Sequence, residues 1–253
     1  MLRFLSIITI TYNNPEDLIN TYKSLDAFRN AGGTHIVVNG GETIKQLIDN
    51  DCVLLEEPDK GIYDALNKGI DLVRTPYLML VHSGDFLVAS CSILKDQLDI
   101  MKERQLDVLL NDCTIEFGGR KRMMSSKLWR PWMFKLGAQP PHPPTIYRNT
   151  SVKGCKYDTN HPVIADYDYL ERLFKKILKY DKGGQTLIHM SAGGKTSSGV
   201  SSFFTVNREF RKLKGILVSS CFIFTRPLIK IIQMILKQPS EWSCANILRC
   251  LNL

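Results

Sequence analysis

Short apolar runs alternate with helix-like stretches along the first part of the chain, and each run ends in polar residues. The apolar runs are short and rich in β-branched residues, which indicates buried strands. The expected strands are residues 5–10, 35–38, 52–55 and 77–81. The expected helices between them are residues 15–30, 43–50 and 63–73. This alternation predicts an α/β fold, with a mostly parallel central sheet flanked by helices on both faces.

Further along the chain the pattern is less regular but continues. A helix is expected over residues 90–104, two strands over 108–111 and 114–117, and a helix over 164–179. Between them, His142 lies in a rigid loop with two prolines on either side. A packed loop histidine and a ligand contact are both open interpretations of that residue.

Polar residues gather where the expected strands end. In an open α/β sheet, ligands bind outside the carboxyl ends of the strands. The sequence therefore predicts a ligand site built from the strand-end segments 11–13, 39–41, 56–59 and 82–85.

The run from Pro58 to Gly69 combines a strand end, a glycine turn and a helix with Asp64 in its first turn. The start of a helix at this edge of a sheet attracts anions, and Lys60 and Lys68 are countercharges that suit a diphosphate. A capped surface helix is the alternative interpretation.

A buried strand also delivers the carboxylate of Asp85 to this edge, directly after Ser83 and Gly84. A divalent cation that shares phosphate oxygens needs only one or two protein carboxylates. The alternative is an ordinary turn residue. The Gly-Gly-Lys-Thr sequence at 193–196 does not complete a phosphate-binding loop, because His189 stands where that motif requires glycine.

The net charge of +8 is concentrated near the C-terminus. Residues 207–253 contain eight Lys and Arg against two Glu, which leaves +2 for the first 206 residues. We expect a catalytic domain over residues 1–205 and a basic, apolar helical tail over residues 206–253. Cations interleaved with aliphatic residues favour an anionic membrane interface, although packing on the protein itself or on a second copy is the alternative. The near-neutral body argues against nucleic acid as a partner.

The compartment is expected to be the cytoplasm. The first apolar run lacks the features of a cleaved signal peptide, and the seven cysteines are odd in number and scattered, as is common for free thiols in a reducing environment. Together with the tail, this predicts a peripheral protein on the inner face of a bacterial cytoplasmic membrane.

In these motifs and their order, the chain resembles the inverting glycosyltransferases of family 2, which have the GT-A fold and build bacterial surface polysaccharides. The resemblance covers about residues 1–202. It is carried by Ser6–Asn13, Pro58–Gly69, Ser83–Asp85, His142, Ala165–Asp168 and Gly199–Ser201.

The resemblance implies a role for each motif. Asp166 matches the catalytic base, with Asp168 as the alternative for that role, and Asp85 matches the ligand of a divalent metal (Mn²⁺ or Mg²⁺), with His142 near that metal. Asp168 and Tyr167 are expected to contact the acceptor or to support the base. The expected donor-binding residues are Thr11, Tyr12, Asn13, Asn39, Asp59, Lys60, Asn67, Lys68, Ser83 and Gly84. The family often has Asp at the position of Asn39.

The implied activity is transfer of a hexose or N-acetylhexosamine from a nucleotide-sugar, a UDP-sugar in the first instance, in one displacement with inversion. The implied acceptor is a polyprenyl-diphosphate-linked glycan of O-antigen or capsule synthesis, and a homo-oligomer is left open. Two alternatives remain: a noncatalytic module that binds nucleotide-sugar or glycan, and a basic membrane-associated adaptor.

Overall fold

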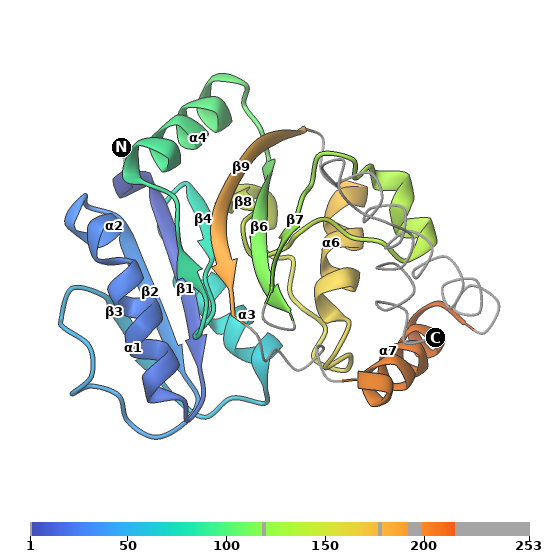
Figure 1. The fold of residues 1–253 in the computed structure, drawn as a ribbon, viewed down its shortest axis with the longest axis horizontal. Helices are drawn as coiled ribbons and strands as arrows, with labels where there is room; N and C mark the ends of the chain where they lie inside the picture. Colours follow the sequence, from blue (N-terminus) through green and yellow to red (C-terminus); the bar gives the residue numbers. More distant parts are fainter. Residues whose placement is uncertain (1, 118–119, 177–178, 192–198, 216–253) are drawn as a thin grey trace.

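Figure 1 shows a computed structural model of the protein, which describes residues 2–117, 120–176, 179–191 and 199–215. The strands are β1 (Leu5–Thr11), β2 (Thr34–Asn39), β3 (Val53–Glu56), β4 (Tyr77–Leu80), β5 (Phe86–Leu87), β6 (Val108–Phe117), β7 (Arg120–Met124), β8 (Ile146–Arg148) and β9 (Tyr180–Met190). The α-helices are α1 (Pro15–Ser24), α2 (Asp26–Asn30), α3 (Ile62–Leu72), α4 (Cys91–Glu103), α5 (Asn149–Val152), α6 (Ala165–Lys176) and α7 (Gly199–Lys214). Two 3₁₀ helices are η1 (Leu2–Phe4) and η2 (Pro131–Leu136).

Over the described residues, the strands form one sheet in the order β3-β2-β1-β4-β8-β6-β9-β5, with β7 beside β6. The first four are parallel, as the alternation of strands and helices predicts. Thr11 pairs with Asn39 and Asn39 with Glu56, so the carboxyl ends of β1, β2 and β3 lie level. Beyond β4 the sheet is mixed, because β8, β7 and β5 join it antiparallel to their neighbours.

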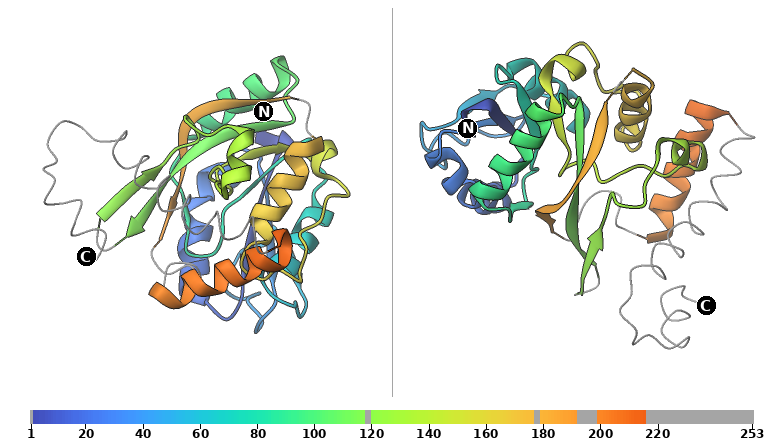
Figure 2. Two further views of the ribbon diagram at one scale, coloured as in Figure 1. Left: turned by 90° about the vertical axis from the view of Figure 1, so that its right-hand side faces the viewer. Right: turned by 90° about the horizontal axis from the view of Figure 1, so that it is seen from above.

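The last two strands in this order, β9 and β5, bring the far end of the sheet close to the carboxyl end of β4. Chain direction places β5 just after β4, yet β5 pairs with β9, at the opposite end of the strand order. The long, curved β9 in Figures 1 and 2 reaches back toward the carboxyl end of β4. As a result, Asp85, which lies between β4 and β5, comes next to Ser191 at the end of β9.

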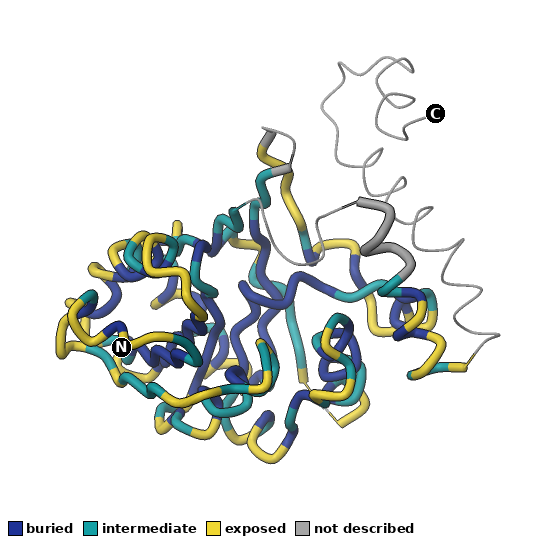
Figure 3. Tube along the Cα trace, turned by 90° about the horizontal axis from the view of Figure 1, so that it is seen from below, coloured by how far each residue is buried: buried dark blue, intermediate teal, exposed yellow. Residues whose placement is uncertain are grey.

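Two apolar layers cover the sheet, one on each face. On one side, Leu66 of α3 and Leu170 of α6 belong to a single buried cluster with the strands. On the other side, Phe28 of α2 and Leu94 of α4 do the same. Figure 3 shows the buried residues concentrated along the central strands and the inward faces of the helices. The strand ends are therefore held in place by a rigid, close-packed core.

Three elements differ from the sequence-based expectation. The helix expected over 15–30 is interrupted at Leu25, where the backbone leaves helical geometry between α1 and α2. The strands expected at 108–111 and 114–117 are one strand, β6. The helix expected over 43–50 is absent, and that prediction is wrong: the Glu56 carboxylate accepts the N–H of Ile44 at 2.7 Å, and the Tyr22 hydroxyl accepts the N–H of Asp49 at 3.2 Å. The Asp49 N–H is a donor that a helix over these residues would direct to the carbonyl of Lys45.

The expected domain boundary at residue 205 lies within α7. This helix packs against the body, because Phe210 is buried and the Glu209 carboxylate accepts the N–H groups of Val163 and Ile164 at 2.9 and 3.1 Å. The rest of the expected tail, residues 216–253, lies outside the described residues. Among the helices that the structure describes, none combines the length and apolar character needed to cross a bilayer.

Candidate functional site

The ends of β1, β2 and β4 are tied together at one edge of the sheet. The Thr11 hydroxyl donates to Ser83 Oγ at 3.4 Å, and the Ser83 N–H donates to the Ile10 carbonyl at 3.2 Å. The Gly40 N–H donates to the Thr11 carbonyl at 3.2 Å. The polar residues predicted from the strand ends thus meet along one rim, as parallel strands require.

The side-chain amide of Asn39 organises the loop that follows β2. Its Nδ2 donates to the Glu42 carbonyl at 2.6 Å and to Glu56 Oε1 at 3.3 Å, while its Oδ1 accepts the Gly41 N–H at 3.0 Å. With Glu56 opposite, this position needs a hydrogen-bond donor, which an amide supplies and a carboxylate does not. Asn39 is buried and fully engaged within the protein.

Tyr12 and Asn13 lie on the open side of this rim. Tyr12 is 64% exposed, so its ring is available to a flat ligand. Asn13 has a left-handed backbone, with φ of 48°, and its Oδ1 accepts the Glu42 N–H at 2.9 Å. The loop after β1 is therefore fastened to the loop after β2, with the tyrosine left free.

The loop before α3 closes tightly over the end of β2. Asp59 Oδ1 accepts the Gly61 N–H at 2.8 Å. A Cβ at Gly40 would lie 1.7 Å from Asp59 Oδ2, so a larger residue there would have to displace the Asp59 carboxylate. Gly61 precedes α3 with φ of 117°, a value that favours glycine. Lys60 is exposed at this turn, and its backbone N–H donates to Asp64 Oδ2 at 3.0 Å.

Asn67 and Lys68 hold neighbouring segments of the protein in place. The Asn67 amide pairs with the backbone of Tyr157, accepting its N–H at 2.8 Å and donating to its carbonyl at 3.0 Å. The Lys68 ammonium donates to the Pro58 carbonyl at 2.7 Å and to Glu57 Oε1 at 2.9 Å, and this carboxylate contact raises the pKa of Lys68. Both side chains therefore fix neighbouring segments at this edge of the sheet: Lys68 fixes the loop before α3, and Asn67 joins α3 to Tyr157.

Asp85 is buried at the end of β4, and no cationic side chain among the described residues is paired with it. Gly84 before it has φ of 93° and donates its N–H to Thr21 Oγ1 at 2.9 Å. Only 7% of Asp85 is exposed, and burial raises the pKa of Asp85 to about 7, against an opposing hydrogen bond from the backbone of Ser191. No ion pair to Asp85 occurs among the described residues.

This environment fits a divalent cation in one respect. A buried carboxylate lacking a countercharge is stabilised by a bound cation. The described residues contain no cluster of three His, Cys, Asp or Glu side chains able to hold a metal ion by themselves. Asp85 would therefore be a single protein ligand, with diphosphate oxygens and water completing the coordination shell. The negative charge of Asp17 further raises the pKa of Asp85, so Asp17 is an additional carboxylate close to this position.

His142 is engaged by two tyrosines. Its Nδ1 lies 2.6 Å from the Tyr147 hydroxyl and its Nε2 lies 2.5 Å from the Tyr157 hydroxyl. The ring is buried, which lowers the pKa of His142 to about 3. Both nitrogens have partners, so this arrangement supports the packed-histidine interpretation and offers no nitrogen to the metal expected near Asp85.

Asp166 lies at the start of α6 in a cradle of three donors. Its Oδ2 accepts from Gln139 Nε2 at 2.7 Å, and its Oδ1 accepts from the Tyr167 N–H at 2.8 Å and the Tyr63 hydroxyl at 3.4 Å. Burial raises the pKa of Asp166, and these donors oppose that rise. A carboxylate fixed in orientation, with its pKa moved toward neutrality, is suited to accept a proton.

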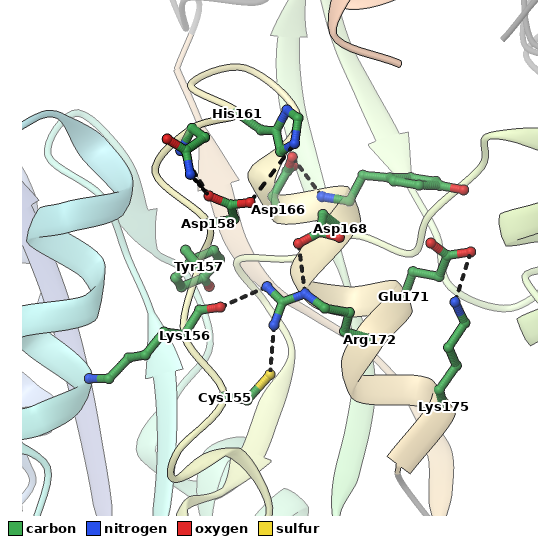
Figure 4. A network of polar contacts seen from close by, with 12 residues as sticks. Cys155, Lys156, Tyr157, Asp158, His161, Asp166, Asp168, Glu171, Arg172 and Lys175 are labelled. Carbon is green, nitrogen blue, oxygen red and sulfur yellow. Dashed lines mark hydrogen bonds and ion pairs between the residues drawn. The ribbon is translucent and has the colours of Figure 1, made fainter. Parts of the chain in front are cut away.

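Asp168 and Tyr167 face other neighbours, as Figure 4 shows for Asp168. Asp168 Oδ2 accepts from Arg172 Nε at 2.7 Å, one turn further along α6, and Arg172 also donates to the Lys156 carbonyl. The Tyr167 hydroxyl donates to the Phe134 carbonyl. Asp168 therefore anchors the segment before α6, while Asp166 alone of the two lies in the cradle.

Sequence reasoning missed the partners that complete these sites. Gln139 and Tyr63 hold Asp166, Ser191 contacts Asp85 and Gly84, and Asp17 lies beside Gly84. Asp17 stands in the first turn of the helix after β1, which is a usable signal for a residue near the rim. The other contacts join segments far apart in the chain, and no spacing pattern indicates them.

Comparison with known proteins agrees with the resemblance to glycosyltransferases that the motifs carry. No protein-family model matches the chain. Over 87 residues it is 37% identical to two Mycobacterium tuberculosis proteins, both named as uncharacterized glycosyltransferases, from strains CDC 1551 / Oshkosh and ATCC 25618 / H37Rv. The match covers 32% of this chain and 33% of each relative, so it extends over about a third of their length.

Solved structures of S. aureus TarS share the fold. TarS residues 1–349 superpose with a TM-score of 0.61 at 16% identity, over 87% of this chain and 70% of that one. TarS has also been solved with UDP (TM-score 0.59, 16% identity, 86% and 69% covered) and with UDP-GlcNAc (0.55, 17%, 86% and 70%). At such identity the likeness establishes the fold alone. The GT-A fold expected from the motifs is confirmed, and so is the resemblance of this chain to glycosyltransferases.

Proposed function

We propose that the protein is a glycosyltransferase that takes a sugar from a nucleoside-diphosphate donor, a UDP-sugar in the first instance. The observation that carries this proposal is the separation of two carboxylates into different environments. Asp85 is buried beside the strand-end rim with no ion pair to any described residue, and Asp166 is held by donors at the start of a helix. The likeness to TarS, solved with UDP and UDP-GlcNAc, supports uracil as the nucleobase of the donor.

In this proposal the rim holds the donor. Tyr12 offers an exposed ring to the base, and Asn13, Asn39 and Asp59 fix the surrounding loops. The residues near Asp85 fit a divalent cation, Mn²⁺ or Mg²⁺, which when bound would neutralise the diphosphate leaving group. Thr11, Ser83 and Gly84 set the position of that carboxylate.

The reaction is a single displacement with inversion. Asp166 takes the proton of the acceptor hydroxyl on a carboxylate oxygen as that hydroxyl attacks the anomeric carbon. The new C–O bond forms, the bond to the diphosphate breaks, and the electron pair leaves with the diphosphate. Gln139 and Tyr63 keep the carboxylate oriented throughout, which lowers the entropic cost of the encounter.

We also propose a lipid-linked acceptor and a peripheral position on the inner face of the bacterial cytoplasmic membrane. The support is the charge distribution, with +6 in residues 207–253. Polyprenyl-diphosphate-linked glycans of surface polysaccharide synthesis are acceptors found at such a surface. A homo-oligomer is compatible with the proposal.

Thermal unfolding in the presence of UDP, GDP, dTDP or CMP tests the donor site, each with Mn²⁺, Mg²⁺ or EDTA. A ligand at about 100 times its dissociation constant stabilises the folded state by about 2.7 kcal/mol, which moves the Tm measurably. We expect a shift with UDP that is lost in EDTA and in Asp85→Asn. The matched control is Asp96→Asn, an exposed carboxylate on α4 that should leave the shift unchanged.

The two alternatives give different results. A noncatalytic nucleotide-sugar module would show the UDP shift but no transfer, with Asp166→Asn indistinguishable from the wild type. A membrane adaptor would show no shift with any nucleotide. That second outcome would contradict the proposed donor site.

A further inference from the structure

A long stretch of the chain is free of acidic residues. Residues 117–157 contain nine Lys and Arg and no Asp or Glu. In a chain with 25 acidic residues overall, this is a strong local imbalance. It lies outside the basic tail, so a second part of the protein carries excess positive charge.

Large apolar side chains are exposed within the same stretch. Trp132 is 59% exposed and Leu128 is 47% exposed, and two methionines of β7 are also exposed, Met123 at 54% and Met124 at 41%. Scattered exposed apolar residues are ordinary, but four within ten positions form a local concentration. We call residues 120–135 the β7–η2 segment.

The exposed residues stand on a fixed base. Trp129 is buried, donates from Nε1 to the Ala138 carbonyl at 3.2 Å, and packs edge-on against Phe134 and Phe174 with ring centroids 5.1 and 5.0 Å away. Met133 is buried as well. Because these neighbours anchor the segment to α6, Trp132 is held outward by the fold.

Exposed cations alternate with the exposed apolar side chains along this segment. Lys127, Arg130 and Lys135 are exposed, and none of the three forms an ion pair with a carboxylate among the described residues. Burial lowers the pKa of Lys182, and the nearby Arg130 guanidinium lowers it further. Trp, Met and Leu interleaved with Lys and Arg are typical of surfaces that lie in a bilayer interface.

The basic surface continues on α7. The Tyr167 hydroxyl donates to the Phe134 carbonyl of η2, and the Tyr167 ring packs against Phe210 of α7. Arg208, Arg211 and Lys212 are exposed on the outer side of that helix, spaced three and four residues apart. Figure 1 shows η2 and α7 at the same end of the molecule, on the same side of α6.

We propose that the β7–η2 segment docks on the surface of an anionic lipid bilayer, with Trp132 and Leu128 in the interface and Lys127, Arg130 and Lys135 on the headgroups. Charge complementarity favours this occupant over the chain's own residues 216–253, which carry four Lys and Arg against one Glu and would be repelled. Aliphatic methionine and leucine favour lipid over nucleic acid, whose bases need flat stacking partners.

Docking there has a consequence for the site. Gln139, which donates to Asp166, follows η2 by three residues. The edge of the protein that holds Asp166 would then face the membrane surface. This inference does not depend on sugar transfer, since it concerns binding of the full chain to lipid.

The test is co-sedimentation of the full-length protein with vesicles of phosphatidylcholine and phosphatidylglycerol, or of phosphatidylcholine alone. We expect binding to the anionic vesicles that weakens with added salt, and binding at least about tenfold weaker for Trp132→Ser/Lys135→Glu. The matched control is Val88→Ser/Lys95→Glu, which removes an exposed apolar residue and an exposed lysine near α4. It should bind as the wild type does.

A second readout leaves the β7–η2 segment itself unchanged. In a Trp242→Phe background, brominated lipids should quench the fluorescence of Trp132, because the remaining Trp129 is buried. Absence of quenching, or equal vesicle binding by both double variants, would overturn the proposal. So would loss of RNA oligonucleotide binding in Trp132→Ser/Lys135→Glu with vesicle binding unchanged.

Discussion

Gln139 Nε2 donates a hydrogen bond to Asp166 Oδ2 across 2.7 Å, joining the loop after η2 to the first turn of α6. A donor to the ionised carboxylate stabilises the charged form. Burial acts in the opposite direction and raises the pKa of Asp166. The balance of these two effects sets the pH range in which Asp166 can accept a proton.

Replacing Gln139 with Leu should therefore move the acid limb of the pH profile of kcat/KM to higher pH. Without the donor, the carboxylate protonates more readily, and a hydrogen bond to a charged group contributes about 1.5–3 kcal/mol. On the acid side of the profile, we expect turnover to fall by about tenfold or more. The measurement is the pH dependence of sugar transfer or donor hydrolysis.

Gln46→Leu is the matched control, because Gln46 is exposed and lies far along the chain from Asp166. Its profile should superpose on that of the wild type. An unchanged acid limb in Gln139→Leu, with activity retained, would mean that Asp166 is not the titrating base.

Tyr63→Phe should shift the same limb in the same direction, by less. The Tyr63 hydroxyl donates to Asp166 Oδ1 at 3.4 Å, a longer contact than that of Gln139. The ring stacks on Tyr157 with centroids 5.4 Å apart, and phenylalanine preserves that contact. Comparing the two profiles and that of the double variant measures whether the donors act on one carboxylate. A larger shift for Tyr63→Phe than for Gln139→Leu would contradict the geometry.

The first half of the fold could be predicted from the sequence because its signals are local. The strand expected over residues 5–10 appears as β1, and the helix expected from residue 15 begins there, where the Asn14 side chain accepts the Asp17 N–H. In the second half, the helices expected over 90–104 and 164–179 appear as α4 and α6, whereas β8 and β9 could not be predicted, because pairing with distant strands defines them. The helix expected at 43–50 does not form, and there the hydroxyl of Tyr22, 27 positions earlier in the chain, accepts the Asp49 N–H that a helix would use.

The candidate site follows the same division. Asp85 and Asp166 were found because each stands at an element end within a motif. The metal role expected for His142 rested on its place in a proline loop, and the tyrosine contacts of that ring are invisible in the sequence. Lys68 and Asn67 were expected near the donor, whereas their observed bonds are to Glu57, Pro58 and Tyr157.

Asn39→Asp should destabilise the protein at neutral pH by about 1–3 kcal/mol, the cost of a buried group left without its partner. The new carboxylate would face Glu56, whose own pKa is lowered mainly by the Ile44 N–H, so Glu56 remains charged. Urea unfolding measures the loss. The double variant Asn39→Asp/Glu56→Gln should recover part of it, because glutamine restores a donor.

Asn50→Asp is the control for that series, since Asn50 is exposed. It should change the free energy of unfolding by less than about 0.5 kcal/mol. If Asn39→Asp were equally harmless, the observed bond to Glu56 would have no energetic weight.

Acid should destabilise the fold through buried neutral histidines. Burial lowers the pKa of His35 from 6.5 to about 3 and that of His82 to about 4. The unfolded chain then binds more protons below the ordinary pKa, so stability present above about pH 6.5 is lost progressively as the pH falls toward the folded values. At about pH 5.5, each such histidine lowers the free energy of unfolding by about 1.4 kcal/mol.

Urea unfolding between neutral pH and about pH 5 measures this slope. His35→Gln, which retains a group able to bond Thr9, should flatten it, whereas His161→Gln, at a partly exposed position, should not. A slope unchanged by His35→Gln would contradict the assignment of the acid response to that residue.

The proposed function assigns donor binding and proton transfer to different residues, and Asp166→Asn tests that assignment directly. Asparagine keeps the shape of the side chain but cannot accept the proton of an acceptor hydroxyl. The measurement is sugar transfer from the UDP-sugar that the wild type uses, made beside the thermal shift with UDP on the same protein. We predict transfer reduced by about 10²–10⁴-fold with the UDP shift unchanged. Full transfer activity in Asp166→Asn would contradict the account.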